Sequence, residues 1–377
     1  MATSTYLRRM HQRRIIETVA RSGSVSRANL ARATGMSLPT VSRIVDHLLS
    51  RHVLSESQEG IPSPDSGSAR VAVLGRPSTP LELDRRRPRF GIVQLGVRNT
   101  RLAVLPVAIL PEDKWHSEFP TPDSAQAWLK QLAKAWKLHR DKGLKTVVSL
   151  PGVVDESTGK VYLSPNVRWL EKADLGDGLR DIFGPEVVFK QEIRLLALGQ
   201  LAAEPESSDF LLVDSGNGVG AAAVIGGNLF TGGVPLSGEI GHVAVPGNDR
   251  HCGCGAVGCL ETLITRGGIL ASAAEHGHPT SWTTLIDDLT VRPLPAWLKQ
   301  SMESTAVDVA AALNLLGLRQ VIFTGAFREL PPSCVDYLTE AIRQHAMWAR
   351  FGEVSVRTAP RRRQAGVVSV ALDSMLL

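Results

Sequence analysis

The chain has few cysteines and lacks a long apolar run. Its 377 residues include four cysteines, and three of them, Cys252, Cys254 and Cys259, lie within eight positions. Such a distribution does not make a disulfide framework, and a reducing compartment favours metal ligation over pairing. There is no run of about 18 apolar residues, and no apolar segment follows the arginines near the N-terminus, so neither membrane insertion nor export is indicated. We therefore expect a cytoplasmic protein that does not contact a membrane.

The first 89 residues contain no lysine, yet they hold fifteen arginines against seven acidic residues. This segment therefore carries a net charge of +8, and because the whole chain carries +5, the remainder carries −3. A basic module joined to a weakly acidic body is typical of a protein that meets a polyanion through one end. The hydrophobic content of 43% is sufficient for ordinary globular cores in two or three domains.

Residues 13–54 have the pattern of three short helices. Glycines at positions 23 and 35 end the first two helices, and Ser26 is placed to cap the second. Pro39 falls in the first turn of the third helix, where a missing N–H costs nothing. This spacing predicts a helix-turn-helix whose third helix enters a major groove; the alternative is a small bundle for dimerisation or docking, which the charge bias disfavours. The candidate DNA-contacting residues are Ser37, Pro39, Thr40, Ser42 and Arg43.

A wing is expected after these helices. The sequences VAVL at 71–74 and PLELD at 80–84 predict two short strands, joined by a Gly-Arg-Pro turn. Arg76 in that turn is placed to enter a minor groove, although Gly-Arg-Pro is also an ordinary surface turn. We therefore predict a winged helix-turn-helix DNA-binding domain over residues 1–83, followed by a basic linker over residues 84–89.

From residue 90 onward, apolar strands alternate with helices and glycine-rich turns. Two hairpins stand out, one turning at Gly96 and Asn99 and the other at residues 216–220. This pattern predicts an α/β fold of two similar lobes around a cleft. Glycine turns after strands also cradle phosphates, but tight hairpins between buried strands need glycine as well, so this signal leaves both interpretations open.

The cysteine cluster has the donor set of a structural zinc site. His242 and the three clustered cysteines supply one imidazole and three thiolates, which suit closed tetrahedral coordination of Zn²⁺. The alternative is a set of free thiols, but three thiols so close together without a metal would repel and oxidise when ionised. His251 competes for the histidine position with poorer geometry, because it adjoins Cys252. We expect Cys334 to be a buried apolar side chain.

The stretch SGEIGHVAVPGNDRHCGCGAVGCLETLITRGGI closely resembles the signature of the ROK family of repressors, open reading frames and sugar kinases. The resemblance rests on the spacing His-x9-Cys-x-Cys-x4-Cys-x-Glu, and it implies a two-lobed actin-like or sugar-kinase-like body with a structural zinc. It also implies a sugar in the interlobe cleft. We place the first lobe in residues 90–190 with a C-terminal segment of about 358–377, and the second lobe, with the zinc site, in residues 191–357.

The resemblance also implies which residues would meet the sugar. The glutamate and histidine of GEIGH, the glutamate after the last cysteine, an asparagine in a Pro-Asn-x-x-Trp loop and an Asn-Asp pair have this role in the family. The matching candidates for sugar binding are Asn166, Gln191, Glu192, Glu239, His242 and Glu261.

Two departures from the family pattern bear on catalysis. Kinases of the family begin their body with Asp-x-Gly-Gly-Thr, whereas Gln94 occupies the acidic position here. The family's general base is the aspartate of the Asn-Asp pair, and Glu192 replaces it with a longer arm that disturbs in-line geometry. We therefore expect no kinase activity and no catalytic residue, while the turn at residues 216–218 leaves ATP binding open.

Together these features predict a transcriptional regulator, most simply a repressor of sugar-metabolism genes. It is expected to bind a pseudo-palindromic double-stranded operator as a homodimer or homotetramer and to sense a sugar or sugar derivative by closing its lobes. Two alternatives remain: an ATP-dependent sugar kinase that retains a DNA-binding module, and a regulator whose sugar pocket has decayed so that it senses no ligand.

Overall fold

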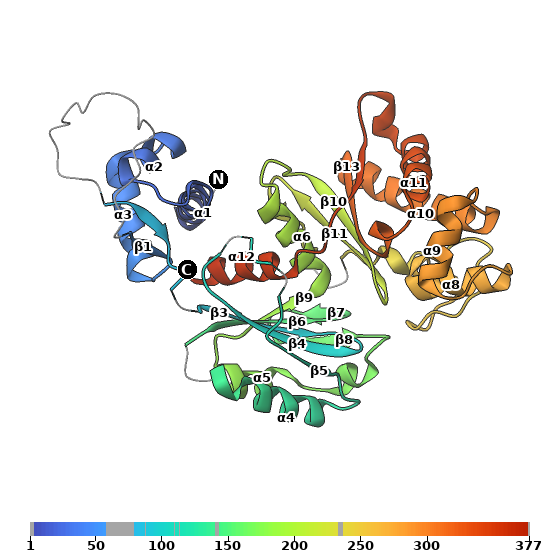
Figure 1. Ribbon diagram of the computed structural model, residues 1–377, viewed down its shortest axis with the longest axis horizontal. Coiled ribbons are helices and arrows are strands. Elements are labelled where there is room, and N and C mark those ends of the chain that lie inside the picture. The colour runs from blue at the N-terminus through green and yellow to red at the C-terminus, as the bar shows by residue number, and fades with distance from the viewer. Residues whose placement is uncertain are drawn as a thin grey trace.

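The computed structural model describes residues 4–57 and 79–375, except residues 87, 109, 113, 140–142 and 233–236. A small helical domain lies at one end of the elongated molecule, and a body built on two sheets forms the remainder (Figure 1). Within the described residues, no helix is both long enough and apolar enough to cross a membrane.

The N-terminal domain has the predicted three helices and a two-stranded sheet. The Ser26 hydroxyl accepts a hydrogen bond of 3.2 Å from the Asn29 N–H, and Gly35 ends the second helix with a φ of 71°. Ser37 caps the third helix, and Pro39 lies in its first turn. The helix-turn-helix spacing predicted from the sequence is therefore confirmed. Its elements are α1 (Ser4–Ser22), α2 (Arg27–Thr34), α3 (Leu38–Ser50), β1 (Leu54–Glu56) and β2 (Leu81–Leu83).

The wing contains a strand pairing that the sequence did not predict. The strand in PLELD is confirmed, but its antiparallel partner is β1, with Leu54 opposite Leu83. The predicted partner VAVL and the candidate Arg76 lie outside the described residues. Strand β1 directly follows α3 and carries the buried Leu54, so this short strand contributes to the core of the domain.

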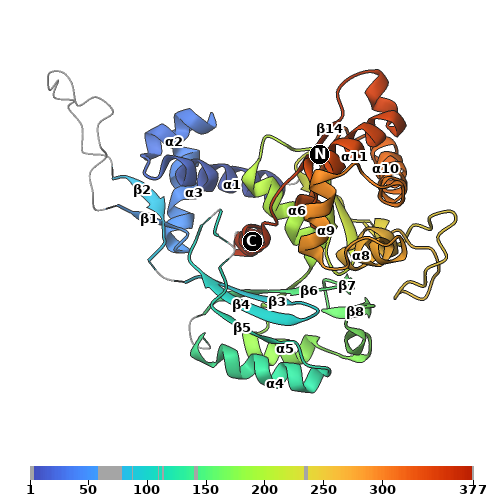
Figure 2. The same cartoon turned by 45° about the vertical axis from the view of Figure 1, so that its right-hand side comes forward.

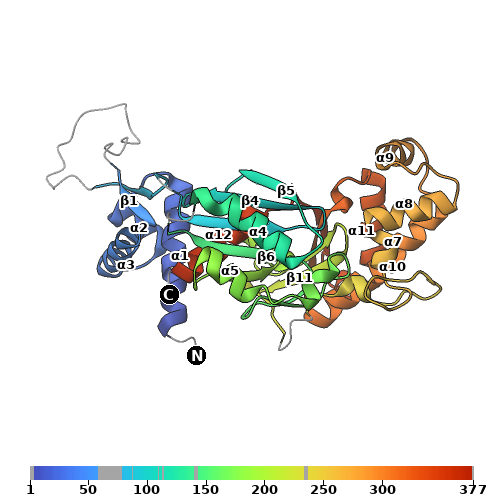
Figure 3. The same ribbon diagram turned by 90° about the horizontal axis from the view of Figure 1, so that it is seen from below.

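The first lobe is a five-stranded sheet in the order β5-β4-β3-β6-β9. Strands β3 and β4 form an antiparallel hairpin, and β6 and β9 run parallel to β3. Helices α4 and α5 cover one face of this sheet (Figures 2 and 3). Helix α4 ends at Trp136, where a 3₁₀ turn (Lys137–His139) follows. The elements are β3 (Phe90–Leu95), β4 (Asn99–Leu105), β5 (Ser117–Pro120), α4 (Ala125–Trp136), β6 (Lys145–Leu150), α5 (Gly176–Phe183) and β9 (Val188–Gln191), with a small hairpin of β7 (Val153–Asp155) and β8 (Lys160–Leu163) and a 3₁₀ helix η2 (Arg168–Lys172).

The second lobe repeats the same strand order. Its sheet runs β12-β11-β10-β13-β14, with an antiparallel hairpin followed by two parallel strands. The prediction of two similar α/β lobes is therefore confirmed. The strands are β10 (Phe210–Ser215), β11 (Val219–Ile225), β12 (Asn228–Leu229), β13 (Gln320–Gly325) and β14 (Ser355–Thr358). The helices are η3 (Ile240–His242), α7 (Glu261–Ile264), α8 (Arg266–Glu275), α9 (Trp282–Val291), α10 (Ala296–Leu316), η4 (Ala326–Arg328), α11 (Pro332–His345) and η5 (Met347–Arg350).

Two helices, α6 (Glu192–Ala203) and α12 (Arg363–Met375), pack against each other at the junction of the two sheets. They cross closely, since a Cβ added at Gly366 would lie 1.9 Å from the Leu195 carbonyl oxygen. A Cβ added at Gly199 would lie 2.0 Å from the Arg362 carbonyl oxygen. Both helices begin at the cleft, so this junction positions cleft residues relative to both lobes.

Candidate functional site

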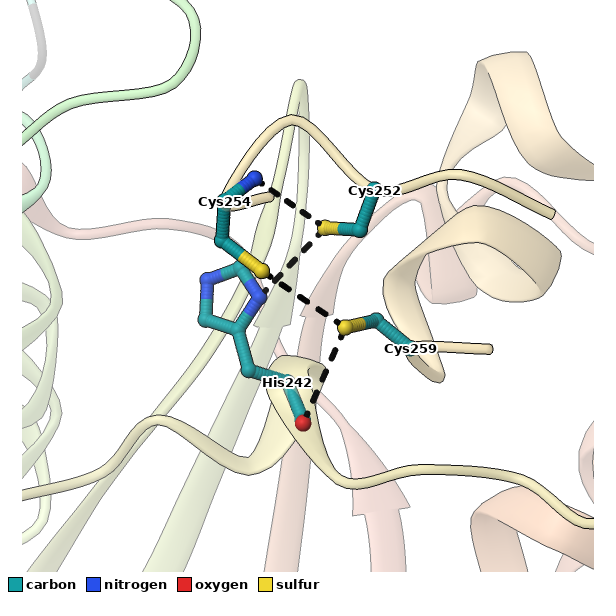
Figure 4. A group of neighbouring side chains, drawn as sticks. All are labelled: His242, Cys252, Cys254 and Cys259. Carbon is teal, nitrogen blue, oxygen red and sulfur yellow. Dashed lines mark hydrogen bonds between the residues drawn. The ribbon is translucent and has the colours of Figure 1, made fainter. Parts of the chain in front are cut away.

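Four side chains form a compact cluster in a loop of the second lobe. The ligand atoms of His242, Cys252, Cys254 and Cys259 all lie within 4.8 Å of one another. Figure 4 shows the three thiols and the imidazole turned toward a common centre, with His242 supplied by η3 and the cysteines by the following loop. The structure thus brings together all four residues that the sequence nominates for a metal.

The spacing within the cluster fits a tetrahedral metal. A zinc–sulfur bond of about 2.3 Å gives sulfur–sulfur separations of roughly 3.8 Å at tetrahedral angles. The Sγ atoms of Cys254 and Cys259 lie 3.7 Å apart, and the Cys252 Sγ lies 3.6 Å from Nδ1 of His242. Three thiols and one imidazole in this arrangement can hold one metal ion with no open position for substrate.

His242 faces the cluster and the cleft with different ring nitrogens. Its Nδ1 is turned toward the thiols, while Nε2 lies 3.9 Å from a carboxylate oxygen of Glu239. A metal-bound imidazole usually donates its second N–H to a carboxylate or carbonyl group, which fixes the ring. Burial raises the pKa of Glu239, and the nearby His242 acts against that rise. One histidine can therefore serve the metal and orient a cleft carboxylate.

Glu261 connects the cysteine loop to the cleft. The Cys252 thiol donates a hydrogen bond of 2.9 Å to Oε1 of Glu261, and Oε2 accepts one of 3.4 Å from the Val219 N–H. Burial, assisted by Glu261, raises the pKa of the Cys252 thiol. A Cβ added at Gly218 would lie only 3.1 Å from Oε2, so glycine at this turn leaves room for the carboxylate.

A cavity of about 510 Å³ between the lobes is lined by every residue predicted to meet a sugar. Its mixture of carboxylates, amides and one imidazole offers hydrogen-bond donors and acceptors to paired hydroxyl groups. Glu239 also accepts a hydrogen bond of 3.2 Å from the Gln191 amide, which holds both side chains in place. The six residues are Asn166, Gln191, Glu192, Glu239, His242 and Glu261.

The carboxylate of Glu192 is already engaged inside this cavity. Its Oε1 accepts a hydrogen bond of 2.9 Å from the Gln94 amide and one of 2.7 Å from Nε of Arg363. A general base needs a carboxylate that is free to take a proton from substrate, and an ion pair with a guanidinium disfavours that transfer. The two departures predicted from the sequence, Gln94 and Glu192, therefore contact each other directly.

Arg361 and Arg363 line the cleft, although the sequence did not nominate them as site residues. Arg361 makes two hydrogen bonds to the Asp214 carboxylate, of 2.6 and 2.8 Å, and a third of 3.0 Å to the Ser215 carbonyl. Arg361 is half-buried, and its pKa is raised because the bonds to Asp214 outweigh the effect of this burial. A Cβ added at Gly216 would lie 2.8 Å from its guanidinium, so Arg361 covers the glycine turn. The run of three arginines at 361–363, just before the last helix, is the sequence signal for them.

Two contacts join loops on opposite sides of the cleft. Arg168 in η2 donates a hydrogen bond of 2.9 Å to the Gly253 carbonyl in the cysteine loop. Asn166 lies 3.5 Å from the carbonyl of Asn217, in the glycine turn of the second lobe. The loop after β8 therefore approaches both the metal cluster and the glycine turn, and it helps to close this side of the cavity.

The predicted DNA-contacting residues lie on the first turns of α3. Ser37, Pro39 and Arg43 are exposed, while Thr40 and Ser42 are half-buried. The apolar side of the same helix packs into the core through Val41, among others. The exposed side therefore presents small polar groups and one guanidinium to solvent, as recognition of base edges and phosphates requires.

His251 and Cys334, the other histidine and cysteine considered as ligands, are not part of the four-residue metal cluster. His251 is exposed and pairs with Val257 through backbone bonds, so it does not supply a ligand atom to the four-residue group. Cys334 is fully buried in the core of the second lobe, as predicted, where burial raises the pKa of its thiol to about 12.

Family models and similar proteins agree with this architecture. The model for the ROK family matches residues 90–372, and a model for winged helix-turn-helix DNA-binding domains matches residues 11–54. The DNA-binding transcriptional dual regulator NagC of Escherichia coli is 22% identical, with 91% of this chain and 87% of that protein covered. The xylose repressor of Caldicellulosiruptor bescii is 21% identical over 100% of this chain and 98% of its own length.

A solved structure shows the same fold over the full length. A ROK family transcriptional regulator, described as a homologue of the E. coli MLC protein, superposes with a TM-score of 0.71 at 16% identity, covering 98% of each chain. Together the two family matches cover parts of the N-terminal domain and both lobes, and the superposition covers all of these regions. The chain belongs to the ROK family and joins a winged helix-turn-helix DNA-binding domain to the family's two-lobed body.

Proposed function

We propose that this protein is a sugar-responsive transcriptional repressor that binds operator DNA through α3 and the wing. The observation that carries the proposal is the combination, in one chain, of an exposed polar turn on α3 with a polar cleft supported by a metal cluster. Similar full-length proteins are named as repressors, which supports the same reading. The DNA-contacting set comprises Ser37, Pro39, Thr40, Ser42 and Arg43, with Arg76 in the wing.

The metal in the cluster is proposed to be structural zinc. His242 and three cysteines would fill all four tetrahedral positions, so the ion would brace the loop and supply no reaction. The loop leads directly into Glu261, two residues after Cys259. Holding this loop holds the Glu261 carboxylate where a ligand hydroxyl can reach it.

The ligand is proposed to be a sugar or sugar derivative held between the lobes. Glu239 and Glu261 accept hydrogen bonds from hydroxyl groups, Asn166 and Gln191 donate and accept them, and His242 does so through Nε2. Ligand binding would then change the lobe arrangement and with it the half-site spacing of a homodimer or homotetramer on a pseudo-palindromic operator.

We propose no catalytic role for the cleft. Glu192 is paired with Arg363, and Arg361 covers the glycine turn where phosphate groups would need backbone N–H groups. The ion pairs of Arg363 with Glu192 and of Arg361 with Asp214 therefore lie where a phosphoryl donor would bind. A regulator needs the cleft only to bind a ligand, and these two ion pairs do not prevent ligand binding.

A direct experiment separates sensing from catalysis. The purified protein selects its own site from random double-stranded DNA, and its affinity for that site is measured at fixed salt with and without D-xylose, N-acetyl-D-glucosamine and their phosphates. We expect one sugar to change the affinity by about fivefold or more. Glu261→Gln should remove that change while leaving DNA binding without sugar intact. Failure to select any DNA would refute the proposal, whereas selective DNA binding without a sugar effect would indicate a decayed pocket.

A further inference from the structure

The winged-helix domain is fastened to the last helix of the chain. Arg13 in α1 makes hydrogen bonds of 2.6 and 2.7 Å to the Asp373 carboxylate and one of 2.7 Å to the Ser369 hydroxyl, both in α12. Apolar residues of α1 and α12, including Ile15, Ile16 and Val368, belong to one continuous buried cluster. The DNA-binding domain therefore shares a core with α12 and is not a freely tethered module.

The opposite end of α12 lies in the cleft. Arg363, the first residue of α12, donates to the Glu192 carboxylate, and Glu192 is the first residue of α6. Arg361, two residues earlier, is held by Asp214 at the end of β10 in the second lobe. One short segment therefore contacts α6 at the junction of the lobes and β10 of the second lobe, and it continues directly into the helix that carries the DNA-binding domain.

The backbones of α12 and α6 are in direct contact where the two helices cross. The backbone at Gly366 touches the Leu195 carbonyl, and the backbone at Gly199 touches the Arg362 carbonyl, so closely that neither position has space for a methyl group. Helices in such contact shift together, because independent movement would open a void or create a clash. A displacement of Glu192 or Arg363 is therefore passed along α12 to its far end.

We propose that α12 couples the cleft to the DNA-binding domain, with the Glu192–Arg363 contact as its cleft end and the Arg13–Asp373 contact as its DNA end. A ligand that engages Glu192 competes with Arg363 and so shifts α12, and Arg13 makes α1 follow. This inference rests on the proposed function, since it names the route by which the cleft controls DNA binding. Arg13 is a positioning residue in this scheme, because it contacts neither the cleft nor the face of α3.

The bidentate contact between Arg13 and Asp373 suits this role. Two of the three hydrogen bonds from Arg13 reach the Asp373 carboxylate, and a bidentate guanidinium–carboxylate contact fixes orientation as well as distance. The Glu192–Arg363 contact is more buried than the Arg13–Asp373 contact, so its loss is felt more strongly by the surrounding side chains. We call this route the relay: α12 joins the Glu192–Arg363 contact at the cleft to the Arg13–Asp373 contact, the clamp, at the DNA-binding domain.

The test is a double-mutant cycle in the full-length protein without ligand. Glu192→Gln removes the charge that holds Arg363, Arg13→Gln removes the clamp, and the third variant carries both. Affinity is measured for the DNA site that the unaltered protein selects from random sequence. We expect Glu192→Gln to change the dissociation constant by about fivefold or more. In the Arg13→Gln background the same substitution should change it by less than about twofold, the range expected for independent sites.

Matched variants separate positioning from charge. Arg14→Gln removes the same charge from the neighbouring exposed position of α1, and it should leave the effect of Glu192→Gln intact. Arg13→Lys retains an ion pair with Asp373, and it should rescue much of the coupling. If Glu192→Gln acts equally with and without Arg13, or does not act at all, the relay is overturned.

A second measurement does not need DNA. Hydrogen exchange of the backbone amides of α1 should quicken in Glu192→Gln relative to the unaltered protein, and this response should vanish in the Arg13→Gln background. Unchanged exchange in α1 would overturn the relay even if the protein binds DNA. Failure to select DNA together with the expected exchange response would refute the proposed function and leave the relay standing.

Discussion

The Cys252 thiol donates a hydrogen bond of 2.9 Å to the Glu261 carboxylate, so a candidate metal ligand directly contacts a residue that lines the cleft. Disturbance of the cysteine loop is therefore transmitted to the cavity without an intervening element. The relationship ties the stability of the metal cluster to the binding of any ligand between the lobes.

Removal of a cysteine should abolish metal binding and weaken ligand binding. Cys259→Ser is expected to lower bound zinc from about one ion per chain to nearly none, since a closed site needs all four ligands. The melting temperature should fall, and the Glu261-dependent sugar response should disappear. Metal content by elemental analysis and thermal unfolding check this, with Cys334→Ala as a thiol-loss control that keeps the metal. Full zinc content in Cys259→Ser would contradict it.

Substitutions on α3 should weaken DNA binding without unfolding the domain. Arg43 is exposed, and Thr40 is half-buried with its hydroxyl 2.9 Å from that of Ser37, so Arg43→Ala with Thr40→Ala leaves the buried side of α3 unchanged. If Arg43 reads a base, its loss costs about 1–3 kcal/mol and relaxes specificity, whereas a phosphate contact lowers the salt slope by about one. Titrations at several salt concentrations distinguish these outcomes. The control is Arg350→Ala in the second lobe. Arg350 is exposed, and its loss should leave both the DNA affinity and the salt slope unchanged.

The purified protein should not transfer phosphate from ATP to a sugar. Glu192 is bonded to Arg363 and Gln94, so it is poorly placed to accept a hydroxyl proton. ADP release coupled to an enzymatic readout, with D-glucose, D-xylose and N-acetyl-D-glucosamine as acceptors, should stay at background. An authentic hexokinase serves as the positive control in the same assay. Turnover that disappears in Glu192→Gln would establish a kinase.

Replacement by alanine should have opposite effects at two helical glycines, because one lies in the tight crossing of α6 and α12 and the other has free space around it. Gly366→Ala places a Cβ 1.9 Å from the Leu195 carbonyl oxygen, so it should lower the free energy of unfolding by about 1–3 kcal/mol or more. Gly267→Ala in α8 meets nothing within 4 Å, so it should raise that free energy by about 0.4–1 kcal/mol. Urea unfolding measures both, and a neutral Gly366→Ala would show that the helices can separate at little cost.

Asp308 in α10 should make stability depend on pH. Burial raises its pKa to about 6, and no partner of its Oδ2 atom is found within the described residues. A raised carboxyl pKa in the folded state means that its contribution to stability is greatest below the ordinary pKa and is lost as pH rises through about 6. Asp308→Asn should therefore raise the melting temperature more at pH 8 than at pH 5.

The comparison variant for this pH effect is Asp336→Asn on the neighbouring helix α11, where the carboxyl group is exposed. It removes the same charge without relieving burial, so its effect on the melting temperature should be small at both pH values. Equal stabilisation by Asp308→Asn at pH 5 and pH 8 would rule out titration of Asp308 as the cause.

The elements with local signals were predictable from the sequence. Ser26, Gly35 and Ser37 mark helix ends by their own backbone and side-chain chemistry, so the three helices follow from short windows. The four metal-cluster residues follow from a spacing of donor atoms along one loop. The pairing of β1 with β2 was not predicted, because strand pairing depends on which segment reaches the edge of a sheet, and β1 reaches it immediately after α3.

The sequence by itself determined the two-part organisation, the helix-turn-helix and the donor set of the metal cluster, since each depends on charge or spacing between near neighbours in the chain. Only the tertiary structure decided that Arg363 meets Glu192 and that Arg13 meets Asp373, 171 and 360 residues apart. Such pairs depend on how α6, α12 and α1 pack, and no local pattern encodes that packing. The route between cleft and DNA-binding domain therefore became visible only in three dimensions.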